Sequence, residues 1–144
     1  MPAYFVNAVL RSRLSRGKVI AAVAEICKAR FGFTKAILAP TLEEWSALID
    51  NNPFPRAAAT PTCLHAAVLV GTPAVEAVSR LRGFAAAGEG IEVVGNVAYL
   101  HTPDGFGRSK LGAKFDRGIG VVNSARNWNT VLKLMELVRK AAGG

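Results

Sequence analysis

The chain has 144 residues, enough for one domain with a hydrophobic core or for two small subdomains that share a seam. Hydrophobic residues make up 51% of it, yet no stretch approaches the roughly 20 consecutive apolar residues that span a membrane, which excludes a membrane-spanning protein. A net charge of +8 favours anionic partners.

The amino terminus does not have the order of a secretory signal. Its basic residues follow the first apolar run instead of preceding it, and no small-residue cleavage pattern comes after them. We therefore expect a cytoplasmic protein without membrane association. Cys27 and Cys63 form no CxxC pair and have no His or Cys neighbour at metal-ligand spacing. We expect two buried free thiols, no metal and no cofactor.

The first predicted elements are a strand and a helix. Residues 4–10 are apolar and β-branched enough for a strand. Ser15 is placed to cap a helix that Gly32 ends. Its apolar stripe recurs at steps of three and four and consists of Ile20, Val23, Cys27 and Phe31.

A short strand and a second helix come next. Residues 35–39 have the composition of a strand and stop at a proline. The segment Thr41-Leu-Glu-Glu44 has the pattern of a capping box, which predicts a helix with Trp45 on its apolar face. Three prolines between residues 51 and 62 prevent long regular structure, so this segment is the predicted linker.

A second series of elements follows the linker. Cys63 to Val70 has the apolar run of a buried strand. Thr72 and Pro73 have the chemistry of a helix start. Two further strands flank Gly95-Asn96, a connection typical of a tight hairpin. The order strand, helix, strand, strand, helix predicts an α+β domain with its helices on one face of a mainly antiparallel sheet.

The last predicted helix, over residues 127–142, is more apolar than a surface helix requires. One stripe holds Trp128, Val131, Met135 and Val138. Leu134 and Leu137 point away from that stripe at 100° per residue. We expect this helix to make contacts on two sides, the second with the other subdomain or with a second copy of the chain.

Residues 101–131 bring glycines, basic residues and polar residues together. Backbone amides at glycines and at a helix N-terminus can bind an oxyanion, and basic side chains add charge-assisted bonds. The alternative is that Asp104-Gly105 only makes a turn beside solvated charges. The glycine spacing fits neither a P-loop nor a dinucleotide fingerprint. The candidate ligand-binding residues are Gly105, Gly107, Arg108, Ser109, Lys110, Arg126 and Asn127.

Nucleic acid is the alternative partner for the same basic residues. Arg126 could meet a phosphate while Trp128 or Phe106 offers a stacking face for a base. Trp128 begins the apolar stripe of the last helix, however, and that position favours the core. The sequence therefore favours an anionic small molecule and keeps nucleic acid as the second hypothesis.

Catalysis is the third and weakest hypothesis. His101 and Asp104 could pair as a general base, and Ser109 is close enough in sequence to supply a hydroxyl. Nothing in the sequence fixes their mutual geometry. We assign no catalytic residues, and whether the protein is an enzyme stays open.

Several segments resemble one bacterial family, the domain-of-unknown-function 1697 family. They are Asn52-Pro-Phe-Pro55, Leu64-His65, Pro103-Asp-Gly-Phe-Gly-Arg-Ser-Lys-Leu111 and Arg126-Asn-Trp-Asn-Thr-Val131. The resemblance implies a cytoplasmic α+β protein of two subdomains, each reminiscent of a ferredoxin-like layer with a mainly antiparallel sheet. We place these over residues 1–55 and 56–144. The resemblance implies no known activity.

The amino-terminal subdomain departs from the family pattern. Members begin with a strand and helix that carry a Leu-Leu-Arg-Gly-Ile-Asn type segment, which this chain lacks, and only Asn7 corresponds to the following strand. We therefore expect an incomplete first subdomain. Missing elements expose a sheet edge and an apolar face that must be covered, so we expect a homodimer.

Overall fold

The structure, a computed structural model, describes residues 12–31 and 38–143. The expected strand over residues 4–10 and Asn7 lie outside these ranges. Of the expected strand over residues 35–39 only the last two are described, and they are not in a strand. The described ranges contain five α-helices, three short 3₁₀ helices and four strands, so the α+β class is confirmed.

The four strands form one sheet in the order β2-β3-β1-β4, and every neighbouring pair is antiparallel. The strands are β1 (Leu64–Leu69), β2 (Gly90–Val94), β3 (Val97–His101) and β4 (Asn123–Asn127). The expected Gly95-Asn96 hairpin joins β2 to β3, with Gly95 at a φ of 61°. From β1 to β4 the chain runs β-α-β-β-α-β, and a third strand lies between the two strands of each β-α-β unit.

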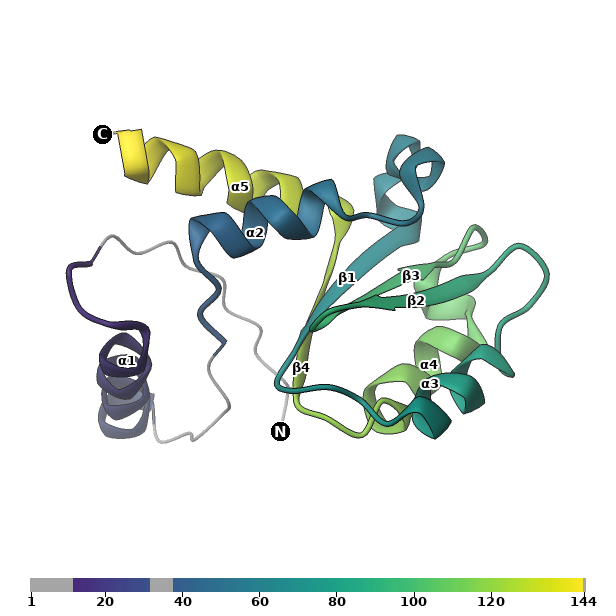
Figure 1. The fold of residues 1–144 in the computed structure, drawn as a ribbon, viewed down its shortest axis with the longest axis horizontal. Coiled ribbons are helices and arrows are strands. Elements are labelled where there is room, and N and C mark those ends of the chain that lie inside the picture. Colours follow the sequence, from purple (N-terminus) through teal and green to yellow (C-terminus); the bar gives the residue numbers. More distant parts are fainter. Residues whose placement is uncertain (1–11, 32–37, 144) are drawn as a thin grey trace.

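Helices cover both faces of the sheet, so the expectation of helices on one face is wrong. α3 (Val75–Arg82) and α4 (Lys110–Gly118) lie on one face, and α2 (Leu42–Asp50) and α5 (Trp128–Gly143) lie on the other (Figure 1). The reason is that α2, which precedes the linker, packs against α5 in one core. None of the described helices is long and apolar enough to cross a membrane.

The first helix, α1 (Arg16–Phe31), begins where predicted. The Ser15 hydroxyl accepts a hydrogen bond from the Lys18 amide at 3.4 Å. No described side chain of α1 is buried, and Cys27 is only half-buried. The expectation of two buried thiols is therefore right for Cys63 and wrong for Cys27. An ion pair from Arg16 to Glu44 joins the start of α1 to the start of α2.

The residues between β1 and α3 delay the start of that helix. Val70 still pairs with the sheet edge, since its amide donates to the Val122 carbonyl at 2.8 Å, and Gly71 then turns the chain at a φ of 96°. The helix therefore begins after Ala74, which offers no side-chain cap. The predicted start at Thr72 and Pro73 is two residues too early.

Strand β4 was not predicted from the sequence. Its residues, Asn-Ser-Ala-Arg-Asn, include no β-branched or aromatic side chain, which are the residues that strands prefer. It forms because β1 offers its free edge, in a register that places Ala67 opposite Ala125. The backbone pairing of a neighbouring strand here outweighs local preference.

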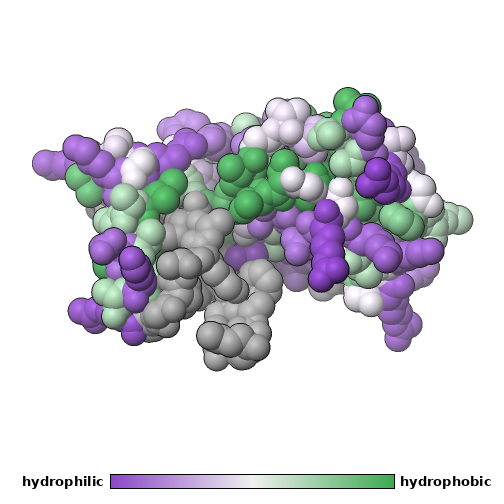
Figure 2. All heavy atoms as spheres, turned by 90° about the horizontal axis from the view of Figure 1, so that it is seen from below, coloured by the Kyte–Doolittle hydropathy of each residue, from purple (hydrophilic) through white to green (hydrophobic). Residues whose placement is uncertain are grey.

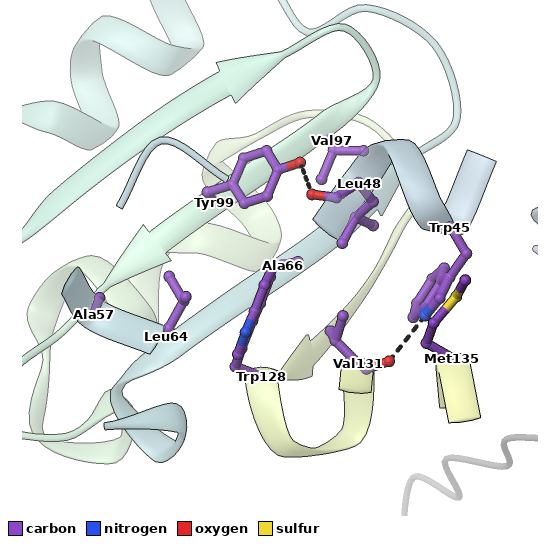
Figure 3. Close-up of a cluster of buried hydrophobic side chains, with 10 residues drawn as sticks. All are labelled: Trp45, Leu48, Ala57, Leu64, Ala66, Val97, Tyr99, Trp128, Val131 and Met135. Carbon is purple, nitrogen blue, oxygen red and sulfur yellow. Dashed lines mark hydrogen bonds between the residues drawn. The ribbon is translucent and has the colours of Figure 1, made fainter. Parts of the chain in front are cut away.

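The core between the sheet and helices α2 and α5 is closed by two long-range hydrogen bonds (Figure 3). The Trp45 indole donates to the Val131 carbonyl of α5 at 2.9 Å. The Tyr99 hydroxyl of β3 donates to the Leu48 carbonyl near the end of α2 at 2.5 Å. Carbonyls in the last turn of a helix have no partner within it, so Tyr99 completes α2. The buried residues of this core are Trp45, Leu48, Ala57, Leu64, Ala66, Val97, Tyr99, Trp128, Val131 and Met135.

A second core fills the space between the sheet and helices α3 and α4. These helices approach closely because Gly118 has no side chain: a Cβ there would lie 2.7 Å from the Leu81 side chain of α3. The buried residues are Ala67, Leu69, Val78, Leu81, Ile91, Ala98, Leu100, Leu111, Phe115 and Ile119. The chain after β3 must cross this face to enter α4, which positions the loop described below.

We predict that Tyr99→Phe lowers the free energy of unfolding by about 1–3 kcal/mol, because it leaves the buried Leu48 carbonyl without its donor. Burial also raises the pKa of Tyr99 to about 12. The raised pKa stabilises the folded state below pH 10, and this contribution is lost as pH rises from 10 to 12. Urea titrations at neutral and alkaline pH should show the gap between the two proteins closing over that range. An unchanged gap would contradict the assignment.

Candidate functional site

The segment from Thr102 to Lys110 leaves the sheet and enters α4 through a tight turn. The Thr102 amide extends the sheet by donating to the Cys63 carbonyl at 2.9 Å, and the Thr102 carbonyl accepts from the Gly105 amide at 2.9 Å. Gly105 has a φ of 103°, which favours glycine. The Gly105 amide is therefore engaged within the turn and does not face a ligand. We call residues 104–110 the loop.

Ser109 is the N-cap of α4. Its hydroxyl accepts a hydrogen bond from the Gly112 amide at 3.0 Å, and the residue is only 5% exposed. This bond satisfies one of the amides that a helix start leaves without partners. Within the described chain the amides of Gly107 and Lys110 have no acceptor. Ser109 thus builds the loop, while those two amides remain available to a ligand.

Phe106 fixes the loop against the sheet and against α4. Its ring stacks on the imidazole of His65 in β1, with centroids 4.2 Å apart and planes at 26°. On the α4 side it meets the backbone of Gly112, where an added Cβ would lie 2.6 Å from the Phe106 carbonyl oxygen and 3.3 Å from its ring. The ring therefore lies between a strand and the first turn of a helix.

The basic side chains of the loop lie at the surface. Arg108 is exposed and has no ion pair with any residue the structure describes. Lys110 and Lys114, one turn apart on α4, lie over the ring of Phe84 with ammonium-to-centroid distances of 5.3 and 6.0 Å. Hydrophilic side chains cover much of the face over α3 and α4, at the right of Figure 2. Arg108, Lys110 and Lys114 thus place positive charge at this surface, beside the exposed carboxylate of Asp104 within the loop.

Asn127 lies near the loop but serves another helix. It stands opposite His65 in the register of β1 and β4, on the face that carries α4. Its side-chain oxygen accepts a hydrogen bond from the Thr130 amide at 3.0 Å, which caps α5. The side-chain oxygen of Asn127 is therefore engaged in capping and not directed to the loop.

Arg126 lies on the opposite face of the sheet from the loop. It stands opposite Ala66, whose side chain belongs to the core beneath α2 and α5. Its guanidinium donates to the Ala125 carbonyl at 2.8 Å, and burial lowers its pKa. The structure thus brings five of the seven candidate residues together at the loop, places Asn127 beside them and separates Arg126 from them.

The side chains considered for catalysis do not converge. His101 alternates with Leu100 along β3 and lies on the α2 face, 5.7 Å from the ring of Phe54 between centroids. Ser109 lies across the sheet and is engaged as a cap. For nucleic acid, Trp128 is 3% exposed and is a core residue, which removes one of the two expected stacking faces.

Two residues at the base of the loop were not singled out by sequence reasoning. The Nδ1 atom of His65 and the hydroxyl of Thr102 are buried and have no hydrogen-bond partner among the described residues. Burial lowers the pKa of His65 and so favours the neutral imidazole. The available signal was a single histidine inside the apolar run of β1, which the sequence suggests is an ordinary core position.

One hollow of the described chain lies away from the loop. It measures about 360 Å³ and opens between α2 and α5, lined by Ile49, Leu132, Met135, Glu136, Arg139 and Lys140. Within residues 12–31 and 38–143, no three His, Cys, Asp or Glu side chains are grouped so as to hold a metal ion. The loop itself lies at the surface, since of residues 104–110 only Ser109 is buried.

Comparison with known proteins gives one match. The family model described as "Protein of unknown function (DUF1697)" matches residues 7–99, which is more than half of the chain. This match ends in β3, before the loop begins. No curated protein and no solved structure matches the chain.

We predict that Gly112→Ala displaces Phe106 and lowers the free energy of unfolding by about 1–3 kcal/mol, because the added methyl group would overlap a backbone oxygen. Gly107→Ala is the matched control, since a Cβ there meets no atom within 4 Å. Urea unfolding and the NMR signals of the His65 ring measure both effects. Equal stabilities and an unmoved His65 signal would contradict the prediction.

Proposed function

The chain belongs to the domain-of-unknown-function 1697 family, which has no assigned activity, and from its geometry we propose that the loop binds an anionic or phosphate-bearing ligand. The observation that carries this proposal is the position of Arg108. Arg108 is exposed and comes directly before Ser109, the N-cap of α4, and the amides of Gly107 and Lys110 nearby have no acceptor in the described chain.

Three physical effects support binding of an anion there. The unpaired amides and the helix dipole give the start of α4 a partial positive charge. A guanidinium can bind two oxygens of a phosphate or carboxylate at once. The Gly107 backbone is open to close approach, because a Cβ at that residue would have no contact within 4 Å. The ligand would thus be held by main-chain and side-chain donors together.

A small anion fits this surface better than nucleic acid does. Proteins that bind nucleic acid use several basic side chains to contact successive phosphates. Arg126, one of the expected phosphate contacts, lies across the sheet from the loop, and Trp128 is buried. Nucleic acid is the alternative ligand, and the binding experiment on Arg108 distinguishes it from a small anion.

We also propose that the protein is a cytoplasmic homodimer, as expected from the sequence. Of the two leucines expected on the second side of α5, Leu137 is exposed, whereas Leu134 packs against the core beneath α2 and α5. Leu132 is also exposed, and these two exposed apolar side chains support an apolar contact on that helix. Sedimentation at increasing protein concentration should show a shift toward twice the mass of the chain. Replacing both exposed leucines by serine should abolish that shift, and a wild-type protein that stays monomeric would contradict the dimer.

We predict that Arg108→Ala weakens binding of inorganic phosphate about tenfold, since a charge-assisted hydrogen bond contributes roughly 1.5–3 kcal/mol. Arg139→Ala, which removes an exposed arginine from α5 on the other face, is the matched control and should leave the affinity unchanged. Calorimetric or NMR titration at fixed ionic strength measures the affinity. If both variants lost phosphate affinity equally, the loss would reflect net charge alone and not a contact made by Arg108. Tighter binding of single-stranded DNA, falling steeply with salt, would favour the alternative.

A further inference from the structure

The ring of Phe106 stacks on His65, and the face of the sheet on which it lies carries two polar groups without partners among the described residues. One is the Nδ1 atom of His65, the residue on which Phe106 stacks. The other is the hydroxyl of Thr102, which is 0% exposed and whose carbonyl anchors the turn at Gly105. Thr102 continues the alternation of β3 beyond Leu100, so its side chain lies on the same face as α4.

Such groups point to a missing partner. Nearly all buried polar atoms in folded proteins have a hydrogen-bond partner, which is protein, ordered water or a ligand. A buried hydroxyl without a partner costs free energy that valine, of similar shape, would avoid. A ligand that supplies a hydrogen-bonding edge at this place would remove that cost.

The loop is built so that Phe106 can leave its position. Gly105 precedes it in a conformation open to glycine, with a φ of 103°, and Gly107 follows it with no contact at its Cβ position. A glycine on each side gives the backbone freedom to rotate the ring outward. The space that the ring would vacate is flat and is bounded by the His65 imidazole and the Gly112 backbone.

We propose that the ligand of the loop is a free nucleoside phosphate whose base replaces Phe106 on His65, an inference that rests on the proposed function. The base is planar and stacks on the imidazole, and its polar edge binds the Thr102 hydroxyl. The phosphate lies outside, at Arg108 and the amides of Gly107 and Lys110. In the absence of ligand, the ring of Phe106 occupies the base subsite and keeps it closed.

The test compares three probes on the whole chain: inorganic phosphate, adenosine 5′-monophosphate and adenosine. The chain has two histidines, so the His65 ring signal reports on the subsite and His101, on the other face, is an internal control. We expect the monophosphate to bind about tenfold more tightly than phosphate, as stacking on an aromatic ring allows. It should shift the His65 signal and leave His101 unmoved.

Two variants separate the subsite from the phosphate contacts. Thr102→Val keeps the shape of the side chain and should reduce the advantage of the monophosphate over phosphate, with phosphate affinity unchanged. Phe106→Ala removes the ring that must be displaced and should strengthen binding of the monophosphate severalfold. Its fold is checked by urea unfolding, and Thr102→Val provides the test if Phe106→Ala proves too unstable.

The two proposals fail in different ways. If phosphate and the monophosphate bind equally and neither variant changes their ratio, this inference is overturned while the anion site stands. If no phosphate-bearing probe binds or moves the Gly107 amide, the proposed function fails and this inference with it. A tetranucleotide without a terminal phosphate that binds more tightly than the monophosphate would overturn the assignment to a free nucleotide.

Discussion

The pairing of β1 on both of its edges is the constraint on which the remaining structure depends. β3 pairs with one edge and β4 with the other, so this strand lies within the sheet. Its side chains must alternate between two cores: Leu64 and Ala66 face α2 and α5, and Ala67 and Leu69 face α3 and α4. His65 lies on the same face as Ala67 and Leu69, but its side chain is a polar ring.

The loop packs against this residue. Helices cover both faces of the sheet, and the loop lies where the sheet ends. The chain leaves β3 at this end, turns at Gly105 and is held by Phe106 against His65 before Ser109 starts α4. Burial of His65, capping of α4 and exposure of Arg108 are therefore consequences of one short connection.

Features that depend on neighbours in sequence could be predicted. The capping box from Thr41 to Glu44 forms as expected, with both of its reciprocal hydrogen bonds, and the hairpin turns at Gly95-Asn96. Each requires only a few adjacent residues, and their chemistry is sufficient. The expected basic, glycine-containing loop also exists, although the Gly105 amide and the Ser109 hydroxyl are used within it.

Features that depend on a distant partner could not be predicted. β4 forms because β1 has a free edge. The register of this pairing decides on which face of the sheet each residue of β4 lies. Arg126 and Asn127 are adjacent in sequence and were expected to act together, yet a strand places adjacent side chains on opposite faces. Thr102 is likewise fully buried just beyond the end of β3, which its residue type does not indicate.

The packing of α2 against the rest of the molecule has a consequence for limited proteolysis. Trp45 and Leu48 are held by hydrogen bonds to α5 and β3, while the connection that follows them is short, proline-rich and exposed at Arg56. Trypsin acting at Arg56 would therefore yield two pieces that remain associated without a covalent link. If the carboxyl-terminal piece were expressed alone, the apolar surface that α2 covers would be exposed. A peptide with the sequence of α2 could then bind to that surface.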